Sequence, residues 1–105
     1  MIEVFKRDGI WPPVVPSVVL VESLSGRQRS DALINRFLKT CDIIEVLPQP
    51  LARRAGALRA QARRGSAVDA IVVAMAEPGG AVLSGDLDDL RALATFADDV
   101  IVHRA

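Results

Sequence analysis

The sequence predicts one α/β domain of 105 residues with a mostly parallel sheet. Short apolar runs rich in Val and Ile alternate with segments that carry helix start and stop signals. The runs are continuously apolar, which is typical of strands that helices cover on both faces. Half of the residues are hydrophobic and only 4% are aromatic, so the core must be built from Val, Leu, Ile and Ala.

The first half of the chain is expected to form strands over 11–16 and 42–48 and helices over 18–24 and 31–40. Both strands are rich in Val and Ile and end at a proline. Ser17 and Ser30 are the N-cap candidates of the two helices, and Gly26 ends the first helix. Leu33 and Phe37 are expected to form the apolar stripe of the second helix.

The second half is expected to alternate helices over 51–64, 67–77 and 87–96 with strands over 81–84 and 100–103. Leu51 and Leu58 share one face of the first of these helices, which ends at Gly65. The next helix, opened by Ser66, is apolar on most sides and is therefore expected to be buried. Acidic residues fill the first turn of the last helix, where the helix dipole favours them.

Composition and charge exclude several classes of protein. The 13 basic and 13 acidic residues cancel, which argues against a nucleic-acid binder held by its overall field and against intrinsic disorder. With Cys41 as its single cysteine, the chain has neither an internal disulfide nor a cysteine zinc cage. His103 is the single histidine and lies in the last strand, so a nucleophilic triad is poorly supported. No secretory signal or membrane span is predicted, and we expect a cytoplasmic protein.

Carboxylates occupy unusual places in this pattern. Glu22 lies within an otherwise apolar helix, Asp69 in the first turn of the buried helix, and Asp86 directly after the strand over 81–84. Residues just past the carboxyl ends of parallel strands line the crevice where ligands bind. Because acids gathered there repel one another, a hard divalent ion such as Mg²⁺ would stabilise them.

Each acid also has a simpler explanation. Asp69 lies three residues after Ser66, which is the spacing of a capping box. A role in capping the start of its helix would by itself explain this residue. Asp86 and Asp89 can serve as acids that complement a helix dipole. Glu22 is the hardest to explain in this way, because an unpartnered carboxylate is costly to bury.

Three segments resemble motif blocks of the PIN domain, most closely those of the VapC toxins of bacterial toxin–antitoxin pairs. They are residues 15–23 (VPSVVLVES), 66–76 (SAVDAIVVAMA) and 82–90 (VLSGDLDDL). The resemblance implies a three-layer α/β/α fold and a Mg²⁺- or Mn²⁺-dependent endoribonuclease that cleaves RNA with a metal-activated water. It also implies RNA and a cognate antitoxin as partners. The apolar excess of the chain makes a second copy of it a further candidate partner, and the lack of a long apolar stretch predicts no membrane partner.

The resemblance assigns roles to individual residues. Glu22, Asp69 and Asp86 match the catalytic, metal-holding acids of the family, and Asp89 matches an additional metal ligand. Ser84 matches the small hydroxyl residue that supports the third acid.

The opening residues depart from the family pattern. A PIN domain begins with the central strand of its parallel sheet, which carries an Asp-x-Ser/Thr block, and none precedes Pro12 here. We therefore expect a chain truncated at its N-terminus, without its central first strand and first Asp, and with weak or absent activity. Residues 1–5 are expected to be a helix remnant rather than a makeshift strand. Glu3 and Asp8 are available as replacement acids, but their spacing supports neither.

Two alternatives stay open. The mean hydropathy of +0.29 fits a non-catalytic module that binds an antitoxin-like partner or itself. An unrelated α/β domain of the receiver type would need a lysine after a late strand, and the only lysines are Lys6 and Lys39.

The arginines also have two interpretations. Those of the helix over 51–64 can form a solvated face. Alternatively, some arginines contact RNA phosphates, and the candidates are Arg27, Arg29, Arg53 and Arg54.

Overall fold

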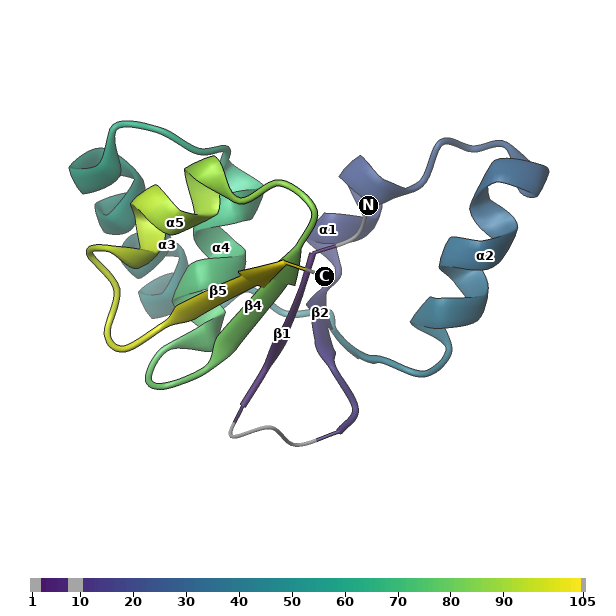
Figure 1. The fold of residues 1–105 in the computed structure, drawn as a ribbon, viewed down its shortest axis with the longest axis horizontal. Helices are drawn as coiled ribbons and strands as arrows, with labels where there is room; N and C mark the ends of the chain where they lie inside the picture. Colours follow the sequence, from purple (N-terminus) through teal and green to yellow (C-terminus); the bar gives the residue numbers. More distant parts are fainter. Residues whose placement is uncertain (1–2, 8–10, 105) are drawn as a thin grey trace.

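A five-stranded mixed sheet organises the residues that the structure, a computed structural model, describes: 3–7 and 11–104 (Figure 1). The strands are β1 (Val4–Lys6), β2 (Val14–Pro16), β3 (Asp42–Ile44), β4 (Ala81–Ser84) and β5 (Ile101–Arg104), and their spatial order is β3-β2-β1-β4-β5. Five helices lie within the described ranges: α1 (Val18–Ser23), α2 (Gln28–Leu38), α3 (Gln49–Ala62), α4 (Ala67–Ala76) and α5 (Asp88–Ala94).

The direction of β1 corrects the expected sheet. The outer pairs β2–β3 and β4–β5 are parallel, whereas β1 is antiparallel to both of its neighbours. The prediction of a mostly parallel sheet without a central strand was therefore wrong. A gap between β2 and β4 would leave the backbone N–H and C=O groups along one edge of each strand without partners. Strand β1 fills this gap and forms hydrogen bonds with both edges.

Residues 1 and 2 of the expected helix remnant over 1–5 lie outside the described residues, and for the rest the expectation was wrong, since Val4 and Phe5 belong to β1. Successive side chains of a strand point to opposite faces of the sheet. Val4 and Phe5 are only 4% and 1% exposed, so both faces are covered at this strand. Two adjacent apolar residues suit this double-sided environment better than one face of a short helix.

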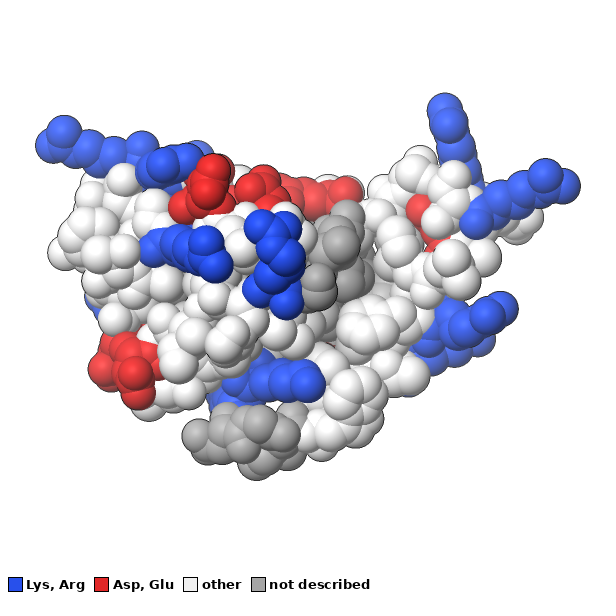
Figure 2. Space-filling model, in the orientation of Figure 1, with Lys and Arg blue, Asp and Glu red and all other residues white. Residues whose placement is uncertain are grey.

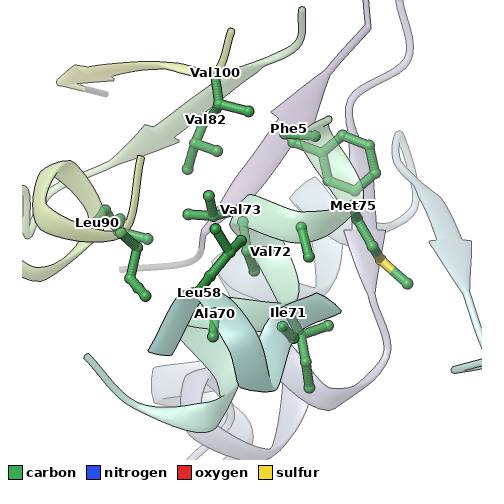
Figure 3. Close-up of a cluster of buried hydrophobic side chains, with 14 of the residues drawn as sticks. Phe5, Leu58, Ala70, Ile71, Val72, Val73, Met75, Val82, Leu90 and Val100 are labelled. Carbon is green, nitrogen blue, oxygen red and sulfur yellow. The ribbon is translucent and has the colours of Figure 1, made fainter. Parts of the chain in front are cut away.

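The core lies between the sheet and α4. Every residue of α4 from Ala70 to Ala76 is buried, as the apolar sequence predicted. Figure 3 shows the cluster where α4 meets Phe5 of β1, Val82 of β4 and Leu58 of α3. Helices α3 and α5 pack on α4, so this helix is covered by protein on most sides.

The region after β2 departs most from the expected pattern. Helix α2 begins at Gln28, earlier than predicted, and lies to the side of the main body in Figure 1. Phe37 and Leu38 connect it to the core, but Leu33 is 72% exposed and does not belong to the buried stripe. Strand β3 ends at Ile44, short of Pro48. Across the described segments, each helix is too short or too polar to cross a membrane.

Candidate functional site

The predicted acids lie at the carboxyl-end edge of β2 and β4. Glu22 follows β2 on α1, and Asp86 follows β4. Helix α4 runs back to the start of β4, so its first turn, with Asp69, returns to the same edge. Acidic side chains appear along the upper edge of the molecule in Figure 2. The topology thus brings together three acids that are far apart in the sequence.

Glu3 joins these acids because β1 runs antiparallel to its neighbours. Val4 pairs with Leu83, so the residue before it lies level with Ser84 at the end of β4. Glu3 was only an unsupported candidate in the sequence, because its spacing carries no motif. The other acid considered there, Asp8, lies outside the described residues. The sequence feature that could have located Glu3 is the adjacent apolar pair Val4 and Phe5. If both residues are buried in a central strand, Glu3 lies at the end of that strand.

The Glu3 carboxyl group is strongly perturbed. Burial, proximity to the Asp69 carboxyl group and the negative charges of Asp69, Glu22 and Asp86 raise its pKa to about 8. Its Oε2 atom is buried and has no hydrogen-bond partner. The perturbation also means that the three predicted acids lie within electrostatic reach of one carboxyl group.

Asp69 has a structural role in addition to its place in this cluster. Its backbone N–H donates to Ser66 Oγ at 3.0 Å, and the Ser66 N–H donates to Asp69 Oδ2 at 3.2 Å. This reciprocal pair is the predicted capping box, which is confirmed. The cap fixes the Asp69 side chain at the start of α4, on the side that faces Glu3.

Ser84 and Asp86 are linked by the turn that follows β4. Ser84 is 3% exposed, and its Oγ accepts a hydrogen bond of 3.1 Å from the Asp86 N–H. The buried hydroxyl therefore fixes the backbone from which the exposed Asp86 side chain projects. This contact fits the supporting role that the PIN resemblance gives to Ser84.

Asp89 already has a cationic partner. Its Oδ1 accepts from Arg64 Nε at 2.9 Å, and both side chains remain about half exposed. Such an exposed ion pair contributes only about 0–1 kcal/mol, so a bound cation could displace it at little cost.

The four candidate phosphate-binding arginines do not form one group. Arg54 makes a bidentate pair with Glu77, at 2.8 and 2.6 Å, beyond the last turn of α4. That end of the ten-residue helix is about 15 Å from its first turn, so Arg54 lies away from the acids. Arg53 is exposed and donates to Gln49, whereas Arg27 and Arg29 are exposed around the start of α2.

An apolar cavity lies at the opposite edge of the sheet from the acids. It has a volume of about 310 Å³ and is lined mainly by apolar residues, including Phe5, Ile44 and Met75. Arg7 Nη2 donates to the Met75 carbonyl oxygen at 3.3 Å beside it. The cavity is therefore separate from the acid cluster.

The chemistry of the cluster fits a hard divalent cation. The side chains that could bind it are carboxyl groups, whose oxygens such a cation prefers. Over residues 3–7 and 11–104, however, no group of three or more His, Cys, Asp or Glu side chains is arranged to hold a metal ion. Binding would therefore require these side chains to rotate towards a shared point.

Comparison of this chain with protein-family models, with curated proteins and with solved structures finds no match. The likeness to PIN domains therefore depends on the three sequence segments and their acids alone.

Proposed function

We propose that this protein is a Mg²⁺- or Mn²⁺-dependent hydrolase of RNA phosphodiesters, an endoribonuclease of the VapC toxin type. One feature of the fold supports the proposal: Glu22, Asp69 and Asp86, which the resemblance names as metal-holding acids, follow β2, open α4 and follow β4, and so lie at one edge of the sheet beside the partly buried Glu3. These acids come from α1, α4 and the end of β4, and carboxylate oxygens are the ligands that a hard divalent cation prefers.

The described side chains divide the work of such a site. Asp69, Asp86 and Glu22 would hold the ion, with Asp89 available once it releases Arg64. The bound ion would supply a water of lowered pKa and neutralise charge on the phosphate. Ser66 and Ser84 hold the backbone of two of the acids by the hydrogen bonds described above. Arg27 and Arg29 are exposed and would bind RNA phosphates without distinguishing bases.

Substitution of the central acids tests this proposal. With a fluorescently labelled RNA and Mg²⁺ or Mn²⁺, we expect Asp86→Asn and Asp69→Asn to slow cleavage by about 100-fold or more, since even outer-shell partners of metal sites cost 10–100-fold. The matched control is Asp98→Asn, an exposed acid in the loop before β5, at the opposite edge of the sheet. Cleavage that persists in EDTA, or equal rates in all variants, would contradict the proposal.

A second candidate is a non-catalytic module that binds an antitoxin-like protein or a second copy of the chain. Large apolar side chains on the outside favour it: Val21 is 81% exposed, Leu33 72% and Val46 68%. For this function we expect association that strengthens with concentration in light scattering and weakens in Leu33→Ser. A chain that stays monomeric at all concentrations would exclude self-association.

A further inference from the structure

The cavity at the edge of the sheet opposite the acids has the size of a small-ligand site. Its volume is about 310 Å³, and buried side chains form its inner end, those of Phe5, Ala74 and Met75 (Figure 3). Half-buried side chains of β2, β3 and α3 form its walls: Val14, Ile44 and Leu51. Ligand pockets measure about 300–1,000 Å³, and an apolar cavity of about 150 Å³ is large enough for benzene. This cavity therefore has room for an apolar molecule of roughly ten non-hydrogen atoms.

Arg7 brings a positive charge to the mouth of the cavity. Two contacts orient its guanidinium group. Nη2 donates to the carbonyl oxygen of Met75 at 3.3 Å, and Cζ lies 5.7 Å from the centroid of the Phe5 ring. A guanidinium group has five N–H donors in a planar fork, and of these two contacts only the first uses a donor. The contacts thus hold the group in place and leave further N–H groups for a ligand.

Two acids also line the cavity, and they limit the charge that a ligand can carry. The Glu77 carboxylate accepts two hydrogen bonds from Arg54 and a third from the Asp98 N–H at 2.7 Å, so its charge is already compensated. Asp42 is exposed at the start of β3, and Arg7 belongs to neither of the ion pairs found within the described ranges. One arginine beside one exposed aspartate favours a ligand with a single negative charge over a ligand with two.

We propose that this cavity binds a monocarboxylic acid with an apolar tail of about eight carbons. The tail would lie against Phe5, Ile44 and Met75, and the carboxylate would accept paired hydrogen bonds from Arg7, because the planar guanidinium group matches a carboxylate. The site lies at the other edge of the sheet from the acids and needs neither RNA nor a metal ion, so it is independent of the proposed function. The competing arrangement is purely structural, with Arg7 only connecting the end of β1 to the end of α4.

Titration of the purified, ¹⁵N-labelled full chain with sodium octanoate, followed by two-dimensional NMR, tests this site. We expect saturable shifts in the amide signals of Phe5, Ile44 and Met75, and no shift in that of Asp69 at the acidic edge. The titration contains EDTA and no RNA, so its result does not depend on nuclease activity. The matched neutral ligand is 1-octanol, which has a tail of the same length. It should bind about tenfold or more weakly, because a hydrogen bond to a charged group contributes at least that factor.

Three variants locate the charge and the tail. Arg7→Gln should reduce the affinity for octanoate about tenfold or more and leave the affinity for 1-octanol nearly unchanged. Arg29→Gln, which changes an exposed arginine on α2, is the matched control and should bind both ligands as the wild type does. Ala74→Leu adds volume at the inner end of the cavity and should weaken the binding of both ligands. Circular dichroism checks that each variant is folded.

Several results would overturn the proposal. They are an absence of saturable octanoate binding, equal affinities of the wild type for octanoate and 1-octanol, and equal octanoate affinities in the wild type and Arg7→Gln. Shifts centred on exposed apolar residues such as Val21 and Leu33, rather than on the cavity, would also overturn it, because they would show non-specific binding to the surface. If Ala74→Leu does not fold, the comparison of the two ligands in the wild type and Arg7→Gln still decides.

Discussion

At the scale of single residues, the surroundings of the acidic side chains shift their pKa values in different directions. Hydrogen bonds from Arg54 and burial have opposite effects on Glu77, and the hydrogen bonds prevail, so its pKa is lowered. Backbone N–H groups of Ser25 and Gly26 donate to Asp31 and lower its pKa in the same way. Burial and the nearby acids Asp69, Glu22 and Asp86 shift the pKa of Glu3 in the opposite direction. It is the acid whose protonation should be easiest to detect.

The raised pKa of Glu3 predicts how stability changes with pH. The folded chain keeps a proton up to about pH 8 that the unfolded chain releases near 4.5. The contribution of Glu3 to the free energy of unfolding is therefore fully present below about pH 4.5. It is lost as the pH rises through 8. Because the side chain is partly exposed, solvent screening reduces the effect to about 1–2 kcal/mol.

The comparison of wild type with Glu3→Gln isolates this effect, since the other titrating groups are common to both chains. In urea unfolding with EDTA present, the wild type should lose stability relative to Glu3→Gln between about pH 5 and about pH 9. A constant difference between the two chains over that interval would mean that Glu3 titrates normally.

At the scale of elements, the sequence predicted best where local signals and burial agree. The helix over Ala67–Ala76 has a capping box and a run of apolar residues, and the strand over Ala81–Ser84 is bounded by glycine on both sides. Both were located within a residue. The direction of β1 could not be predicted in this way, because three residues carry no periodic signal. The direction of β1 is decided by its pairing with strands that are distant in the sequence, and that pairing depends on the rest of the sheet.

The same distinction explains the site. Asp69 and Asp86 were identified because each follows a recognisable cap or strand end. Glu3 has no such neighbour, and its place depends on the long-range pairing of Val4 with Leu83. Leu33 was wrongly assigned to the buried stripe because its spacing from Phe37 is helical, although its side chain is exposed to solvent. A helical period identifies an apolar face but not whether the fold covers it.

At the scale of the whole molecule, the core and the acid cluster share one strand. Phe5 packs beneath the centre of the sheet against α4, while Glu3, two residues earlier, reaches the acidic edge. The parallel pairs β2–β3 and β4–β5 are joined through β1. Loss of β1 would therefore divide the sheet and remove Glu3 from the site together.

Truncation of Phe5 should therefore destabilise the whole molecule rather than impair the site alone. Phe5 is 1% exposed, and Phe5→Ala is expected to cost about 3–5 kcal/mol, a large part of the roughly 5–15 kcal/mol that stabilises a small domain. Phe96→Ala is the matched control, because Phe96 is 43% exposed and its loss should cost well under half as much. Urea unfolding followed by circular dichroism measures both. Equal midpoints would show that β1 does not hold the two halves of the sheet together, whereas selective loss in Phe5→Ala would mean that the edge carrying Glu3 forms only when the whole core does.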